Sequence, residues 1–207
     1  SYTAFDPIPS LGLELQWLPD DPAASAGGPL EGKGVLSFRI PGAPAYDPKA
    51  TIAQYSGSFA AGRAAGIGEF VDRDGFAYSG EWRTGLMEGE GRLLLANGAE
   101  YVGAFRSGRP DGAGTFIDST GALYEGSFVG GLREGRGIFV PTTGDAFRAD
   151  WKNGAELPGT RHLLPIGEVP YPRVSTAQFA EVDGLRIGII AERRPHKREG
   201  RWRTTTS

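Results

Sequence analysis

Residues that carry much of enzyme chemistry are scarce in this 207-residue chain, which has no cysteine and two histidines. Without cysteine there are no disulfides, no thiol nucleophiles and no thiolate metal sites, so the redox compartment stays undetermined. Nothing in the spacing around His162 or His196 indicates a Ser-His-Asp triad. We therefore expect no catalytic residue, no metal site and no cofactor, and we predict that the chain is not an enzyme.

Long apolar runs are also missing: no segment approaches the roughly 18 residues that indicate a membrane helix. We expect a protein that is soluble or peripheral to a membrane, in a compartment that the sequence does not identify. Because the sequence begins with Ser1 rather than Met, a removed N-terminal signal is compatible with it.

The chain does contain a repeat: every 23 residues, an aromatic residue begins nearly the same sequence motif. Counted from that residue as position 0, most units have Gly at +2, Phe or Trp at +4, and further glycines at +7, +11 and +13. Such a period is typical of stacked supersecondary units, and its strict register argues against the disorder that 33 glycines and 15 prolines would otherwise suggest. The opening residues are Tyr55, Tyr78, Tyr101, Tyr124 and Phe147.

Each unit predicts two antiparallel strands, because positions 0, +2 and +4 share one face of an extended chain and +11, +13 and +15 form a second series. Between units, Asp74-Gly75 and Asn97-Gly98 predict type I′ turns with positive φ at both residues. Within a unit, a six-residue segment with Gly at +7 separates the strands. We expect the glycines at +2, +11 and +13 to make room for aromatic rings.

These units resemble the MORN repeat, whose hallmark is Tyr-x-Gly-x-Trp/Phe-x-x-Gly-x-x-x-Gly-x-Gly. Residues 78–91, YSGEWRTGLMEGEG, match every fixed position, and the last unit departs by having Ala149 at +2. The resemblance implies an all-β fold, an elongated, twisted antiparallel sheet of stacked β-hairpins that forms an open repeat array. It also implies a shallow aromatic groove that is used for protein or lipid contact and for scaffolding.

The domain organisation follows from where the repeat holds. We expect an N-terminal extension, 1–54, with one degenerate repeat between Leu13 and Leu36. Four full repeats and one truncated repeat fill 55–154. A proline-rich strap, 155–180, is expected to run over the array, and one position open to it is within the groove. The remaining segments are a C-terminal hairpin or cap at 181–192, marked by Asp183-Gly184, and a basic tail at 193–207.

The aromatic residues at positions 0 and +4 are the candidate partner-binding groove. If the tyrosine hydroxyls are exposed along its edges, an apolar trough with polar rims suits an extended peptide or an amphipathic helix. The alternative is that these rings interlock to hold the units together, which we favour for each ring taken singly. The candidate groove residues are Tyr55, Phe59, Tyr78, Trp82, Tyr101, Phe105, Tyr124 and Phe128.

Charge adds two further features. Glu88, Asp111 and Glu134 share position +10 and predict a carboxylate row, which we interpret as a solvated acidic edge rather than a cation site. The tail is strongly basic, so it is either a solvated segment or a contact to an acidic partner or anionic lipid. Its candidate contact residues are Arg193, Arg194, Lys197, Arg198, Arg201 and Arg203.

The leading functional prediction is a noncatalytic protein–protein interaction scaffold or adaptor, an accessory subunit of a larger assembly. It would bind a partner segment in the aromatic groove or at the sheet ends, where self-association is also possible. The alternatives are a membrane-surface adaptor that binds anionic lipid through the tail, and a regulatory domain of an enzyme complex. No nucleic acid partner is expected, because the repeats have a negative net charge. The sequence does not name the partner.

Overall fold

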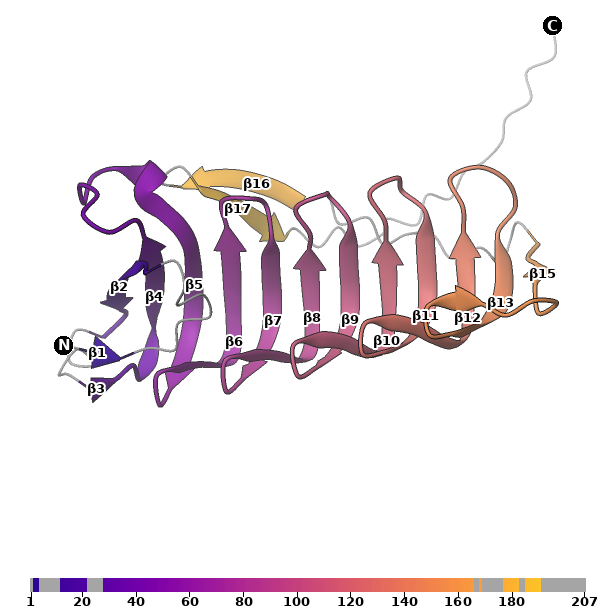
Figure 1. The fold of residues 1–207 in the computed structure, drawn as a ribbon, viewed down its shortest axis with the longest axis horizontal. Coiled ribbons are helices and arrows are strands. Elements are labelled where there is room, and N and C mark those ends of the chain that lie inside the picture. Colours follow the sequence, from indigo (N-terminus) through magenta and orange to yellow (C-terminus); the bar gives the residue numbers. More distant parts are fainter. Residues whose placement is uncertain are drawn as a thin grey trace, which may run out of the picture.

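A single antiparallel sheet of 13 strands runs through most of the chain in the computed structural model. The structure describes residues 2–3, 12–21, 28–165, 168, 177–182 and 185–190; for 2–3 and for the last two segments it describes the strands alone. Strand order along the sheet follows sequence order, and β15 pairs with β13 beside β14. The sheet is open, and its strands stand side by side in one long row (Figure 1). The predicted all-β array of stacked hairpins is therefore confirmed.

The strands of the repeats follow the 23-residue period. Each full unit contributes one strand that contains its opening aromatic near or at its start and a second strand that returns beside it; the opening strand of the first unit begins earlier than the others, at Thr51. These strands are β5 (Thr51–Ala60), β6 (Arg63–Asp72), β7 (Ala77–Arg83), β8 (Leu86–Leu94), β9 (Glu100–Arg106), β10 (Arg109–Ile117), β11 (Leu123–Val129), β12 (Leu132–Val140) and β13 (Phe147–Lys152).

At the N-terminal end, β2 (Glu14–Pro19) pairs with β4 (Gly32–Arg39), which pairs with β5, so this part of the chain continues the sheet. Trp17 lies opposite Leu36, as Tyr55 lies opposite Phe70 in the next unit, so Trp17 takes the place of an opening tyrosine. A 3₁₀ turn, η3 (Pro48–Ala50), leads into β5. Separately, β1 (Tyr2–Thr3) pairs with β3 (Gly28–Pro29).

At the other end, β14 (Ala155–Glu156) and β15 (His162–Leu163) both pair with β13. The first part of the expected strap therefore returns to the sheet edge, and most of 164–176 lies outside the described residues. Further along the chain, β16 (Ala177–Val182) and β17 (Leu185–Ile190) form a separate two-stranded sheet, whose first strand begins within the segment expected as strap, 155–180, rather than at 181. It does not extend the array, since β17 contacts β6 (Figure 1).

The turns differ from the prediction. Within each unit only two residues separate the strands, as with Ala61-Gly62 between β5 and β6, and both have positive φ, 49° and 75°. The type I′ turns therefore lie inside the units, where we expected a six-residue segment. Between units the loops are longer, and in Asp74-Gly75 only the glycine has positive φ. The Asp72 carboxylate accepts hydrogen bonds from the N–H groups of Asp74 and Phe76, and this bonding shapes the loop instead.

The glycines play two roles. Those at +2 and +13 face each other across successive strands, in a row that runs from Gly34 to Gly137 and ends at Ala149. Those at +11, such as Gly89 with φ of 59°, lie at irregularities in the strand register. The prediction that the +11 glycines clear space for rings is wrong, because their role is to allow a left-handed backbone at a bulge.

Candidate functional site

The opening tyrosines are buried in the face of the sheet that carries positions 0, +2, +4, +13 and +15, which we call the aromatic face. Tyr78 and Tyr124 have no exposed surface, and Tyr101 and Tyr55 retain only 2% and 3%. Each ring lies over two glycines on neighbouring strands: a Cβ added to Gly91 would come within 2.4 Å of the Tyr78 hydroxyl. Aromatic rings can lie this close to the backbone only because no side chain intervenes.

The tyrosine hydroxyls point into the structure. That of Tyr78 donates to the Glu81 carbonyl at 2.9 Å, and that of Tyr101 donates to the Ala104 carbonyl at 3.0 Å. Burial raises the pKa of Tyr101, and likewise that of Tyr55, to about 12. The condition for polar rims, that these hydroxyls are exposed, is therefore not met, because they donate to backbone carbonyls of their own strands.

The aromatic rings at positions 0 and +4 form a continuous ladder. Tyr101 contacts Phe105 of its own unit at 5.1 Å between ring centroids and Phe128 of the next unit at 4.9 Å, both edge to face. Tyr55, Tyr78 and Tyr124 repeat this arrangement. The interlocking alternative thus describes the geometry, and the role of these rings in partner binding stays a prediction. Of the eight candidate groove residues, only Trp82 is partly exposed.

A second set of apolar side chains, most of them on the returning strands or the loops that follow, reaches the surface of the aromatic face. These residues are half-buried and pack against the ladder. Sequence reasoning placed position +15 on this face but did not assign it to partner contact. We call this set the apolar strip. It consists of Phe70, Phe76, Trp82, Met87, Leu95, Phe116 and Phe139.

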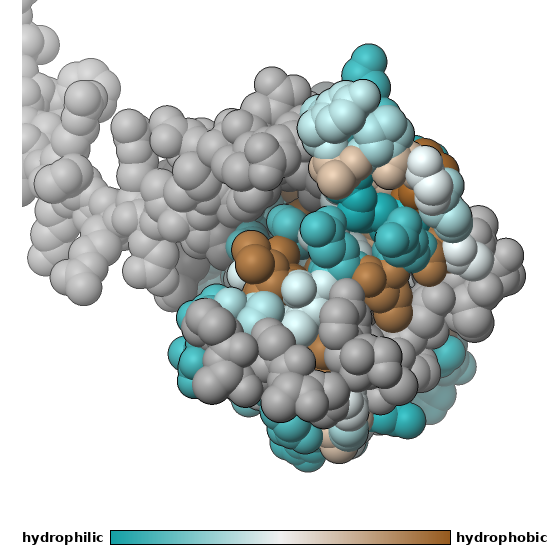
Figure 2. Space-filling view, turned by 90° about the vertical axis from the view of Figure 1, so that its left-hand side faces the viewer, coloured by the Kyte–Doolittle hydropathy of each residue, from teal (hydrophilic) through white to brown (hydrophobic). Residues whose placement is uncertain are grey.

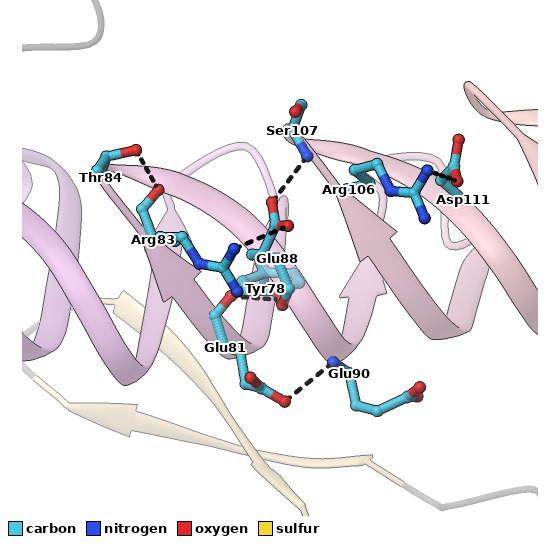
Figure 3. A network of polar contacts seen from close by, with 9 residues as sticks. All are labelled: Tyr78, Glu81, Arg83, Thr84, Glu88, Glu90, Arg106, Ser107 and Asp111. Atoms are coloured by element: carbon cyan, nitrogen blue, oxygen red, sulfur yellow. Dashed lines mark hydrogen bonds and ion pairs between the residues drawn. The ribbon is translucent and has the colours of Figure 1, made fainter.

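The carboxylates at position +10 join consecutive units. The Glu88 carboxylate accepts a hydrogen bond of 3.0 Å from the backbone N–H of Ser107, which lies in the turn of the next unit (Figure 3). Asp111 and Glu134 bind the turn residues Gly130 and Asn153 in the same way. The interpretation as a solvated acidic edge is therefore incomplete, because each of these side chains uses one oxygen to hold a neighbouring turn.

A second bond supports each of these turns. The N–H of the +7 glycine donates to a carbonyl of the preceding unit, as from Gly108 to Met87 at 2.9 Å. The first repeat has Ala65 at +10, so the turn at Thr84 lacks the carboxylate bond; it keeps the backbone bond from Gly85 to Ala64 and accepts a hydrogen bond of 3.5 Å from the Arg63 guanidinium at the Thr84 carbonyl.

A cavity of about 390 Å³ lies at the C-terminal end of the sheet, which we call the end cavity. Phe139, Phe147 and Trp151 form its apolar wall. The Arg161 guanidinium lies 3.8 Å from the centroid of the Phe147 ring and forms a two-point ion pair with Glu156. The sequence did not indicate this cavity, because it depends on where β14 and β15 return.

The opposite end of the array also exposes apolar residues. Viewed onto the end that bears β2 and β4, hydrophobic residues reach the surface among polar ones (Figure 2). Leu18 is 69% exposed and Tyr46 88%. The basic tail residues 193–203 lie outside the described residues, so their contact role remains a prediction.

In a comparison with known protein families, the family model "MORN repeat" matches residues 55–76, 78–100, 101–122 and 124–145. The predicted resemblance is therefore confirmed for these four units. MORN repeats commonly mediate contacts with proteins or membrane lipids and are generally noncatalytic, which supports a general interaction scaffold. No curated protein matches the chain. Within the described residues, no helix is long and apolar enough to cross a membrane.

Proposed function

We propose that this chain, which carries four MORN repeats, is a noncatalytic scaffold that binds a segment of a protein partner along its aromatic face, as an accessory subunit of a larger assembly. The apolar strip is the contact surface in this proposal. Trp82 belongs to the strip, and the other seven candidate groove residues at positions 0 and +4 form the base beneath it.

The observation that carries this proposal is that apolar side chains on this face remain half-buried although the ladder beneath them is closed. Phe70, Met87, Phe116 and Phe139 lie on four successive returning strands, so the strip follows the long axis of the sheet. Aromatic residues and methionine are enriched at protein interfaces, and the flexible methionine side chain adapts to the shape of a partner.

Rigidity supports the same proposal. The ladder, the glycine row and the turn bonds hold the strip in place before a partner arrives, which lowers the entropic cost of binding. A long narrow surface of this kind suits an extended peptide or one side of an amphipathic helix.

The experiment is affinity purification with two matched double variants. Met87→Asp with Phe116→Asp places charge on the apolar strip, whereas Val102→Asp with Ala104→Asp places the same charge on the opposite face of β9. We expect the first pair to lose a stoichiometric partner and the second to keep it, with both variants folded by circular dichroism. Loss in both, or in neither, would contradict the proposal.

A variant that lacks residues 193–207 tests the membrane-adaptor alternative. Binding to anionic vesicles that disappears with the tail, together with a protein partner that does not depend on the strip, would favour that alternative.

A further inference from the structure

We propose that the end cavity is a docking site for a Trp or Phe side chain carried on an extended peptide strand with an adjacent Lys or Arg. The inference deepens the proposed function by adding a second contact point, at the end of the sheet, to the contact along its face.

The ring ladder defines what the cavity accepts. At each of the four internal joints, the opening tyrosine contacts two rings at +4, one from its own unit and one from the next. For Tyr124 these are Phe128 at 5.2 Å and Trp151 at 5.3 Å. Phe147 opens the last unit and contacts Phe139 at 5.4 Å, but among the described residues no further unit follows to supply a +4 ring. The end cavity lies against this Phe147 ring.

Trp151 provides a second, independent observation. Trp82, at the same repeat position, donates its indole N–H to the Gly68 carbonyl at 3.0 Å. Trp151 is buried, with 7% of its surface exposed, and it lines the end cavity. Its indole Nε1 has no hydrogen-bond acceptor among the described residues. A buried donor without an acceptor is costly, and because this Nε1 has less than 1 Å² of exposed surface, a backbone carbonyl on an incoming strand would satisfy it only if the Trp151 side chain shifts towards the cavity.

The polar residues that line the end cavity indicate which ligand it favours. Asp145 is exposed and lines the cavity, and it forms no ion pair with a described residue, whereas Glu156 is already bound to Arg161. The unpaired carboxylate favours a basic residue beside the incoming ring. The cavity volume lies within the range of roughly 300–1,000 Å³ that is typical of ligand sites.

The test uses the complete chain and a peptide with the sequence of residues 78–84, YSGEWRT, in which the +4 Trp is followed by Arg. The ¹⁵N–¹H resonance of the Trp151 indole, identified by its loss in Trp151→Phe, reports on the cavity. We expect the peptide to shift this resonance saturably, with a dissociation constant of about 1 mM or tighter. The same peptide with Ala in place of its Trp should not shift it.

Matched variants of one loop test the location. Thr143 lines the end cavity and its neighbour Thr142 does not, and both are exposed. Thr143→Arg should weaken peptide binding at least tenfold, while Thr142→Arg leaves it unchanged. No shift in the folded wild-type chain, or equal binding by both variants, would overturn the inference.

Two further outcomes separate the possible occupants and the two proposals. If deletion of 193–207 alone moves the Trp151 resonance, the occupant is this chain's own tail, with Trp202 between two arginines, and the inference of a partner strand is wrong. Neither loop variant replaces a residue of the apolar strip, which shares only Phe139 with the cavity wall. A partner that still binds through the strip while the peptide titration fails would therefore overturn the end cavity inference alone.

Discussion

The Glu88 carboxylate and the backbone N–H of Ser107 are 19 residues apart in sequence and 3.0 Å apart in space. This hydrogen bond fixes the two-residue turn of one repeat to the preceding repeat (Figure 3). The Glu31 carboxylate accepts a hydrogen bond of 2.7 Å from the Ala61 N–H in the same way, so this series of carboxylate-to-turn hydrogen bonds begins in the N-terminal extension. The joint between the first and second repeats lacks it, since Ala65 holds the +10 position.

Removing one such carboxylate should loosen the array. Glu134→Ala leaves the Asn153 N–H without its side-chain acceptor, and we expect the free energy of unfolding to fall by about 1 kcal/mol, because the site is exposed to water. Urea denaturation measures the change. Glu125→Ala removes an exposed carboxylate of the same unit from position +1 and should be nearly neutral. Equal losses in the two variants would contradict the role assigned to position +10.

Installing the missing carboxylate should have the opposite effect. In Ala65→Glu the new side chain reaches the Thr84 N–H as Glu88 reaches that of Ser107, so we expect a gain of up to about 1 kcal/mol. Thermal unfolding should shift upward by about 2–4 °C. The single variant Ala65→Gln is the control for charge, since its amide oxygen can also accept the hydrogen bond but carries no negative charge. A lower stability for Ala65→Glu would show that the joints are not equivalent.

The glycine row should tolerate no side chain. A Cβ on Gly114 would lie 2.5 Å from two carbon atoms of the Tyr101 ring, and Gly114→Ala should cost about 1–3 kcal/mol through displacement of that ring. Ala113→Ser, on the neighbouring exposed residue, is the matched control and should be close to neutral. Near-UV circular dichroism should report the displaced ring. A neutral Gly114→Ala would contradict the close packing of ring on backbone.

Alkaline pH should unfold the array. Burial raises the pKa of Tyr55 and Tyr101 to about 12, whereas an exposed tyrosine ionises near 10. The unfolded chain therefore releases these protons first, so stability is fully present below about pH 10 and is lost as the pH rises towards 12. Between about pH 10 and pH 12, the absorbance of the tyrosinate band and the fraction of unfolded protein should rise together. Ionisation of all tyrosines near pH 10 without unfolding would show that the hydroxyls are accessible.

The regular part of the fold could be predicted from the sequence because its information is local and repeated. The spacing of Tyr78, Gly80 and Trp82 defines one face of a strand, and five copies define the array. The turns could not be placed this way. Asp74-Gly75 has the stronger local signal, but the Asp72 side chain shapes that loop, while the two-residue turns are held by bonds to the preceding unit.

The site was harder to predict than the fold. The tyrosines are the most regular residues in the sequence, and their regularity reflects burial over glycines rather than exposure. Side chains with surface on the same face give a weaker pattern because they come from different repeat positions: Met87 lies at +9, where the next unit has Pro110, and Phe116 lies at +15. The end cavity depends on the return of β14 and β15 to β13, which no local sequence pattern indicates.

The most direct test of the proposed function is photo-crosslinking in the source cell from two positions. A benzoylphenylalanine at Phe116 lies on the apolar strip, and one at Val102, which is 46% exposed, lies on the opposite face. We predict that position 116 crosslinks to one defined segment of a protein partner and that position 102 does not. Crosslinks from position 102 alone, or the same adducts from both positions, would contradict partner binding along the aromatic face.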